Sequence, residues 1–251
     1  MTAPTCRVLP HVVGDGPANM ALDEALLDSV ADDPVSAVVR TYEWSRPTLS
    51  LGYFQAIAEA ETDPRWLGVP VVRRPTGGGA LWHDREVTYA VVVPGDHPAS
   101  RPSATLYRTV HRAIIAALRE AGVEADRRGD PARAGGDHPR PFLCFADRDA
   151  EDVVSGLAKV VGSAQRRRAG AVLQHGSLLL ARSSTTPELL GIADLGAASP
   201  DADRWARLLR EAIPRALGLR AEAGEFRPGE LARAELLGEE VYGQPAWTRR
   251  R

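Results

Sequence analysis

Lysine is almost absent from this sequence: 31 residues are lysine or arginine, and Lys159 is the one lysine among them. Arginine carries a planar fork that is always charged, whereas lysine is a compact point charge with three rotating donors and a tunable pKa. The exception therefore indicates a position that arginine would not suit, such as one that directs a small cation at a developing negative charge. The alternative is a lysine that compositional drift has left on a surface strand.

Cysteine, long apolar runs and surplus charge are also scarce. Two cysteines, Cys6 and Cys144, are too few for a disulfide framework or a zinc site. No apolar segment follows the first charge near the N-terminus, and no apolar run is long enough to span a membrane. A net charge of −2 argues against a general nucleic-acid binder. We therefore expect a soluble cytoplasmic protein that binds neither membranes nor nucleic acid.

The bulk composition is that of an ordinary globular protein, with 44% hydrophobic and 25% charged residues. A chain of 251 residues buries a core without disulfide or metal support. Arginine is concentrated in three clusters, at 73–74, 166–168 and 249–251. The simplest interpretation of such clusters is solvated surface, and it applies above all to the C-terminal group.

Hydrophobic periodicity predicts a single α+β domain over residues 1–251. A helix is expected at 17–30, a longer one with Ser103 at its N-cap, and a helical region from Asp201 onward that Pro214 kinks. The expected strands are 35–39, 49–53, 70–72, 86–93, 152–157, 159–164 and 172–180. The segment 127–140, rich in glycine, proline and charge, is interpreted as a mobile loop.

Three consecutive glycines, Gly77–Gly79, follow an expected strand and the pair Arg73-Arg74. Backbone without Cβ atoms adopts unusual dihedral angles and lets N–H groups approach a ligand closely. The two arginines suit a phosphate, a carboxylate or a pantetheine-linked group. Neither the Walker pattern nor the glycine spacing of dinucleotide-binding loops is present. The segment is a candidate binding loop, and the alternative is a flexible hairpin.

Lys159 begins the segment Lys-Val-Val-Gly-Ser-Ala-Gln, which ends at Gln165. In a regular strand, Lys159 and Val161 share one face and Val160 lies on the other. A lysine that faces a pocket is a candidate for stabilising an oxyanion or for lowering the pKa of a neighbouring thiol. The segment therefore predicts that Lys159 takes part in chemistry.

Two histidines and one cysteine accompany these segments. His83 follows the glycines, and His175 lies in Gln-His-Gly-Ser at 174–177, which interrupts an apolar strand. Each histidine is either a substrate contact or a structural residue with satisfied hydrogen bonds. Cys144 stands in Pro-Phe-Leu-Cys-Phe, where a cysteine is usually buried and inert, and the same holds for Cys6. From the residues alone, an inert and a nucleophilic Cys144 both remain open.

Taken in order, five segments resemble the biotin/lipoyl protein ligase catalytic-domain family, and its lipoyl branch in particular. They are Asn19–Leu26, Trp44–Gln55, Arg73–Asp84, Lys159–Gln165 and Gln174–Ser177. The resemblance covers residues 19 to 180, and the glycine- and arginine-rich loop with tryptophan of biotin ligases is absent. It implies a mixed β-sheet flanked by helices. The roughly 70 residues after Leu180, with a helical part at 201–251, are short for the additional adenylation domain of many lipoate ligases.

Within this branch the chain is most similar to the cysteine-dependent octanoyltransferases, because Cys144-Phe145 precedes the lysine strand. The resemblance implies that the Cys144 thiolate takes an octanoyl group from acyl carrier protein and passes it to a lysine of a lipoyl domain or of glycine-cleavage H protein. Lys159 would polarise the thioester carbonyl, and N–H groups near Gly77–Gly79 or Gly162-Ser163 would complete the oxyanion site. An apolar tunnel would hold the chain, and no metal, nucleotide or other cofactor is implied.

The resemblance also implies a set of substrate-binding residues. They are Arg73, Arg74, Gly77, Gly78, Gly79, His83, Gly162, Ser163, Ala164, His175 and Gly176. Three alternative functions stay open: an ATP-dependent lipoate–protein ligase, an amidotransferase that moves octanoyl between lipoyl proteins, and a non-catalytic binder of lipoyl domains or acyl groups. The charged segment 147–152 departs from the more aromatic approach of relatives, and it leaves the placement of Cys144 relative to Lys159 open.

Overall fold

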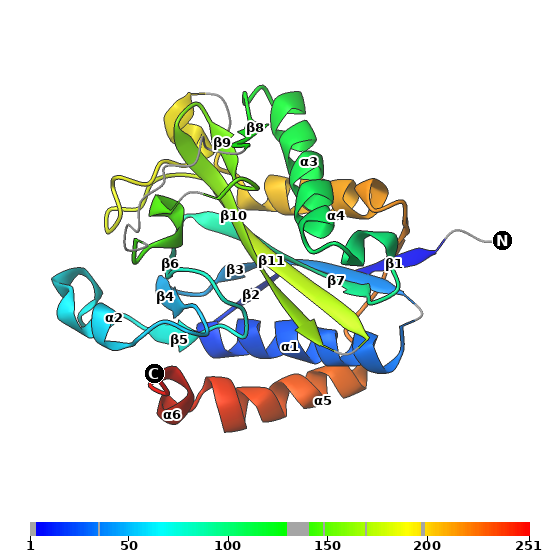
Figure 1. Ribbon diagram of the computed structural model, residues 1–251, viewed down its shortest axis with the longest axis horizontal. Helices are drawn as coiled ribbons and strands as arrows, with labels where there is room; N and C mark the ends of the chain where they lie inside the picture. Colours follow the sequence, from blue (N-terminus) through cyan, green and yellow to red (C-terminus); the bar gives the residue numbers. More distant parts are fainter. Residues whose placement is uncertain (1–3, 35, 130–140, 148, 169, 197–198) are drawn as a thin grey trace.

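A large mixed β-sheet forms the centre of the molecule, with helices on both faces and a smaller sheet at one end (Figure 1). The computed structural model describes residues 4–34, 36–129, 141–147, 149–168, 170–196 and 199–251. Within these residues the large sheet has nine strands: eight follow the order β12-β1-β3-β7-β11-β10-β9-β8, and β2 pairs with β3. The expected α+β class, a mixed sheet with flanking helices, is confirmed.

The elements have the following bounds. The large sheet contains β1 (Thr5–Val8), β2 (Val12–Gly14), β3 (Ala37–Trp44), β7 (Glu86–Pro94), β8 (Asp126–Arg127), β9 (Val153–Ser155), β10 (Ala158–Arg168), β11 (Ala171–Leu179) and β12 (Arg220–Ala223). The smaller sheet contains β4 (Thr48–Leu51), β5 (Val71–Arg73) and β6 (Leu81–His83). The α-helices are α1 (Gly16–Asp32), α2 (Ala58–Thr62), α3 (Ala104–Glu120), α4 (Ala202–Ala216), α5 (Pro228–Leu237) and α6 (Pro245–Thr248). Among the described residues, none of these helices combines the length and the apolar character that a membrane crossing requires.

Side-chain alternation along β7 builds two cores, one on each face of the sheet. Val87, Tyr89 and Val91 belong to a buried cluster with residues of α3 and α4. Ala90 and Val92 belong to a second cluster with residues of α1 and α5. Because successive side chains of a strand point to opposite faces, one central strand supports both layers. Figure 1 shows the two helix layers above and below the sheet.

Helix α1 begins at a strong start signal and carries a polar group into the interior. The Asp15 side chain accepts a hydrogen bond from the N–H of Ala18, and Pro17 lies in the first turn. Both features favour a helix start. The buried face includes the apolar Met20 and Leu26, but also Asp23, which is fully buried. A carboxylate is thereby placed beneath the sheet, next to the site described below.

Ser103 occupies the N-cap of α3 as expected, although its side chain makes no capping hydrogen bond. Other local expectations are wrong. The region after Asp201 is not helical throughout, because β12 interrupts it and pairs in parallel with β1. All four residues of β12 are exposed, so no pattern of buried positions indicates the strand. Arg127 forms β8 rather than a loop, and residues 130–140 of the expected loop lie outside the described residues.

Candidate active site

Cys144 and Lys159 lie side by side, although 15 positions separate them in the sequence. Nζ of Lys159 is 3.8 Å from Sγ of Cys144 and donates a hydrogen bond to the Cys144 carbonyl oxygen at 2.8 Å. Cys144 begins a short 3-10 turn, η3 (Cys144–Ala146), and its side chain is half-buried. A nearby ammonium favours the thiolate form of cysteine. The structure therefore brings the two residues singled out in the sequence into contact.

A β-bulge turns Lys159 toward this thiol. The pairing of β10 with β9 shifts register between Lys159 and Val161. The expected alternation, with these two side chains on one face, is therefore wrong, and the Lys159 side chain lies on the side of Gly162. A Cβ placed on Gly162 would stand 2.9 Å from Cε of Lys159. The extra residue of the bulge redirects the side chain, and Gly162 leaves room for its stem.

Asp152 belongs to the site, and the sequence patterns did not indicate it. Its Oδ1 is 2.9 Å from Nζ of Lys159, and the two side chains are only 6% and 4% exposed. Burial raises the pKa of Asp152, and the charge of Lys159 offsets this in part. The residue directly precedes β9, at the end of the charged segment that departs from the family pattern. The segment that departs from the family pattern therefore contains the carboxylate that pairs with Lys159.

The glycine loop, Gly77–Gly79, packs against the Cys144 segment. The N–H of Ala80 donates to the Phe142 carbonyl oxygen and the N–H of Cys144 donates to the Ala80 carbonyl oxygen, each at 2.8 Å. A Cβ on Gly79 would lie 3.0 Å from both the Cys144 nitrogen and the Phe142 oxygen, so the close approach requires glycine. Among the described residues, no hydrogen bond uses the N–H groups of the glycine loop. These donors are available beside the thiol.

Arg73 and Arg74 are buried and bind backbone carbonyl groups. Arg74 donates to two carbonyl oxygens of the glycine loop, each at 2.9 Å. Arg73 donates to carbonyl oxygens of the segment 52–55 and of Thr248. Burial lowers the pKa of Arg74 to about 10. These contacts show how both arginines shape the loop, and a direct contact of either with a substrate anion stays a prediction.

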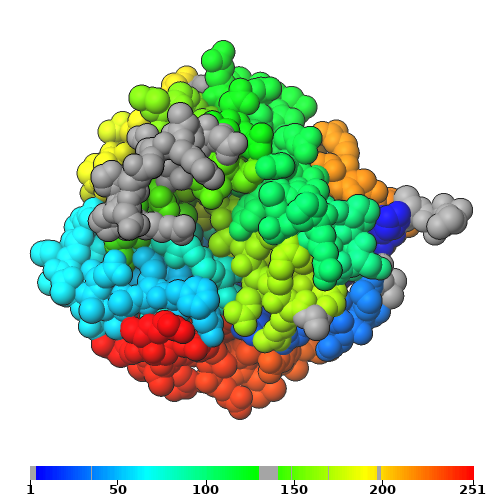
Figure 2. Space-filling view, viewed as in Figure 1, coloured from blue at the N-terminus to red at the C-terminus, as the bar shows by residue number. Residues whose placement is uncertain are grey.

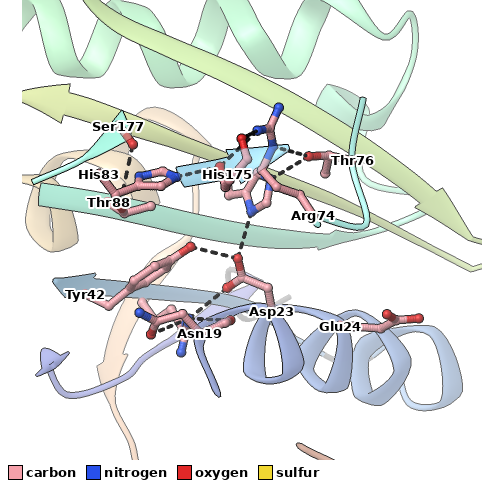
Figure 3. Close-up of polar contacts among 12 residues, drawn as sticks. Asn19, Asp23, Glu24, Tyr42, Arg74, Thr76, His83, Thr88, His175 and Ser177 are labelled. Atoms are coloured by element: carbon pink, nitrogen blue, oxygen red, sulfur yellow. Dashed lines mark hydrogen bonds and ion pairs between the residues drawn. The ribbon is translucent and has the colours of Figure 1, made fainter. Parts of the chain in front are cut away.

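Two histidines of the site are tied to buried carboxylates (Figure 3). Nδ1 of His175 is 2.8 Å from Oδ2 of Asp23, and its Nε2 is 2.7 Å from Oγ1 of Thr76 in front of the glycine loop. Nδ1 of His83 is 2.7 Å from Oε1 of Glu86, and burial lowers the pKa of His83. Both rings thus have satisfied hydrogen bonds, and His175 connects α1 to the glycine loop.

The carboxylate behind His175 is held ionised. Burial alone would raise the pKa of Asp23, but the guanidinium of Arg40 at 2.9 Å and the hydrogen bonds from His175 and Tyr42 hold it below its usual value. A buried charge with this many partners fixes the side chain in one position. The imidazole of His175 is oriented accordingly.

Two cavities meet at Cys144. The outer cleft lies between the glycine loop, the start of α3 and the segment that contains Asp152 and Lys159. The inner cavity is narrow and mainly apolar, with Met20, Trp44 and Leu81 in its wall. Cys144, Ser163 and Ala164 line both. The thiol therefore lies between the outer cleft and the inner cavity, whose volume is only about 20 Å³.

Ser163 lines both cavities and connects them to α3. The sequence indicated no site residue on this helix. Oγ of Ser163 is 2.6 Å from Nε2 of His111, and burial lowers the pKa of His111 to about 4. The ring lies at the wall of the outer cleft. Its position among the apolar residues of an amphipathic helix has no distinctive signal in the sequence. Gly176, opposite Ser163 in the ladder of β10 and β11, lines the inner cavity.

Comparison with known proteins connects this geometry to a family. Residues 15–190 match the model of the lipoyl protein ligase A/B catalytic domain. The chain belongs to this family. A protein named octanoyltransferase LipM from Kyrpidia tusciae is 36% identical over 93% of this chain and 94% of that protein. Another protein of the same name, from Symbiobacterium thermophilum, is 35% identical over 94% of this chain and 95% of its own length.

The fold of the family is found along the whole chain. The crystal structure of lipoate-protein ligase A bound with ATP has a TM-score of 0.78 and 24% identity to this chain, and it covers 98% of each. Relatives that match this chain along nearly their whole length are named octanoyltransferases. This family member is therefore an acyltransferase. In the described ranges, no three His, Cys, Asp or Glu side chains gather in a way that would hold a metal ion.

Proposed function

We propose that this member of the lipoyl protein ligase A/B family transfers an octanoyl group from acyl carrier protein to a lysine of a lipoyl carrier domain, through a thioester on Cys144. The observation that carries the proposal is the position of the Cys144 thiol. It stands beside the Lys159 ammonium, where the outer cleft meets the inner cavity. Similarity to proteins named octanoyltransferase LipM supports the choice of the acyl group.

In the first half-reaction, the Cys144 thiolate attacks the carbonyl carbon of the donor thioester. The new bond to Sγ forms first and the bond to the donor sulfur breaks afterwards, and the proton of the Cys144 thiol ends on the released donor thiol. Negative charge develops on the carbonyl oxygen between these events. The Lys159 ammonium and the unused N–H groups of the glycine loop lie beside the thiol and supply donors for that charge.

The inner cavity has an apolar wall that suits the acyl chain of the intermediate, but its volume is only about 20 Å³, so it must widen before the chain can enter. Its polar residues, such as His83 and His175, bond to partners within the protein and leave a mainly apolar wall. Burial of the chain there contributes about 0.8 kcal/mol for each CH₂ group. The cavity begins at Cys144, so a chain attached to Sγ enters it without crossing the outer cleft.

In the second half-reaction, the amine of the acceptor lysine attacks the thioester carbonyl from the outer cleft. The C–N bond forms as the bond to Sγ breaks, and one proton of the amine returns to the Cys144 sulfur. The product is an amide. A thioester donor is already activated, so neither half-reaction needs ATP.

The test is intact-protein mass spectrometry after mixing with octanoyl acyl carrier protein in the absence of ATP. We expect one octanoyl adduct on Cys144 that hydroxylamine removes and that disappears when an acceptor domain is added. Cys144→Ala should lose both the adduct and the product. Cys6→Ser is the matched control, and it should keep both because Cys6 is buried away from the site.

Other outcomes would identify the alternatives. If Cys144→Ala keeps full activity and product forms only with ATP and free octanoate, the protein is a ligase. An adduct that forms from an octanoylated lipoyl domain but not from acyl carrier protein would make it an amidotransferase. If neither adduct nor product forms under any of these conditions, the protein binds its partners without catalysis.

A further inference from the structure

Three arginines lie over two adjacent aromatic rings next to the active-site cleft. The guanidinium groups of Arg166 and Arg250 lie 5.3 Å and 4.5 Å from the centre of the Tyr53 ring. Arg251 lies 5.4 Å from the centre of the Phe54 ring. Arg166 comes from β10, whereas Arg250 and Arg251 come from the C-terminal segment. We call these five residues the arginine–aromatic patch.

Carboxylate side chains in the described part of the chain do not neutralise the charges of the patch. Among the described residues, no carboxylate side chain pairs with Arg166, Arg250 or Arg251, although Arg249 beside them pairs with Glu61. The charges of Arg250 and Arg251 add to burial in lowering the pKa of the nearby Arg73. Stacking on aromatic rings also holds the guanidinium groups in place, which a merely solvated side chain does not require. The patch is therefore an ordered concentration of positive charge on a chain whose net charge is −2.

The patch also contains an apolar side chain that is largely exposed. Phe54 is 69% exposed and packs edge-on against Tyr53, with ring centres 4.9 Å apart. Figure 2 shows the C-terminal residues, in red, against the segment near residue 50, in cyan, on one face of the molecule. An exposed aromatic ring bordered by arginines is the composition of a protein-binding surface rather than of ordinary solvated surface.

The patch borders the outer cleft. A Cβ on Gly77 would meet the Phe54 ring at 3.9 Å, and the Tyr53 N–H donates to the Thr76 carbonyl oxygen at 2.8 Å. Arg166 donates to the Pro75 carbonyl oxygen at 3.1 Å. The glycine loop that follows these residues lines the outer cleft together with Cys144. A protein seated on the patch can therefore extend a flexible arm to the thiol.

We propose that the arginine–aromatic patch is the docking surface for the acyl donor, an acidic carrier protein whose phosphate-bearing arm enters the outer cleft beside the glycine loop. The inference rests on the proposed function and names the surface that one of its two protein substrates uses. The donor fits better than the acceptor because its arm carries a phosphate, which arginine binds strongly. The acceptor instead delivers a lysine, whose ammonium suits the acidic side of the outer cleft, at Asp149 and Glu151, rather than the three arginines.

The test compares two donors in the first half-reaction, with acyl-enzyme formation as the readout. One donor is octanoyl acyl carrier protein, and the other is octanoyl-pantetheine, which has neither a carrier domain nor a phosphate. Arg250→Glu is the principal variant, since Arg250 makes no side-chain hydrogen bond within the described residues. Arg166→Glu is a second variant, and Arg207→Glu, exposed on α4, is the matched control.

We expect Arg250→Glu to raise the KM for the carrier protein about tenfold or more, with kcat nearly unchanged. The KM for octanoyl-pantetheine should stay at the wild-type value with every variant, and Arg207→Glu should change neither donor. Added salt should raise the KM for the carrier protein in the wild type and less in Arg250→Glu.

Three outcomes would overturn the docking surface. They are an unchanged KM for the carrier protein in both variants, an equal loss with both donors, and a loss confined to transfer from the acyl-enzyme to the acceptor. The last result would assign the patch to the acceptor. Failure of the proposed function is recognised separately, because the wild type would then form no acyl-enzyme with either donor.

Discussion

Replacement of Lys159 by methionine tests the buried ion pair at the centre of the site. Methionine keeps an unbranched apolar stem but removes the ammonium, which leaves the Asp152 carboxylate without its 2.9 Å partner. The two side chains are only 4% and 6% exposed, so water replaces the lost charge poorly. Removing one partner of a buried pair typically costs about 3–5 kcal/mol. We expect Lys159→Met to lose stability of this size at neutral and alkaline pH.

The loss should depend on pH in a defined direction. Burial raises the pKa of Asp152, and removal of Lys159 removes a cause that lowers it. A carboxyl group with a raised pKa in the folded state binds protons more readily when folded than when unfolded, so stability falls as pH rises. At low pH Asp152 is protonated and neutral in the variant. The penalty should therefore be smallest near pH ~4, the ordinary value of the group, and grow above it.

Urea unfolding followed by tryptophan fluorescence at about pH 5 and about pH 8 measures this effect. The set is the wild type, Lys159→Met, Asp152→Asn and the double variant, which together isolate the coupling between the two side chains. The double variant should regain most of the loss at the higher pH, because it buries no charge. The reasoning fails if Lys159→Met lies within about 1 kcal/mol of the wild type at the higher pH, or if its penalty is the same at both pH values.

Three further predictions concern the chemistry of the same site. Lys159→Arg should fold but lose most turnover, because the larger planar head overfills a space shaped for an ammonium; turnover at the wild-type rate would show that positive charge alone suffices. Gly162→Ala should lower turnover about 10²-fold, since its Cβ would stand 2.9 Å from Cε of Lys159 and displace the ammonium. Gly229→Ala, where a Cβ meets nothing within 4 Å, is the control, and an equal loss in both would contradict the explanation. Cys144 should react with iodoacetamide at neutral pH much faster than Cys6, because burial raises the pKa of Cys6 to about 12 and keeps it a thiol; equal rates in peptide mapping would argue against an activated Cys144.

Local patterns predicted the parts of the fold that depend on neighbouring residues. The central strands β7 and β11 lie within one residue of their expected bounds, because long apolar runs bounded by turn residues report burial directly. Strand β12 left no such signal, since its four residues are all exposed. Its existence depends on pairing with β1, more than 200 positions away. Pairing between distant segments is not encoded in the pattern of either one.

In the site, too, the sequence indicated which residues are unusual, but not which groups they contact. The glycine loop and the lone lysine were recognisable because each is unusual in this sequence, whereas Cys144 became a candidate only through the family resemblance. The arginines next to the loop suited an anionic ligand in the sequence, but their donors bind backbone carbonyl oxygens in the structure. The C-terminal arginines looked like solvated surface, yet Arg250 stacks on a ring near residue 50. Composition indicates what a side chain can bind, and only the tertiary structure supplies the partner.

The sequence by itself determined which chemistry is available: a thiol, one ammonium, a flexible loop rich in N–H donors, and two apolar strand faces to build a core around them. The tertiary structure alone decided how they combine. The bulge in β10 directs Lys159 to Cys144, and Asp152 becomes its counter-ion after a turn of the chain. The physical reason is that charge interactions depend on distance and burial, and both are set when segments remote in sequence pack against each other.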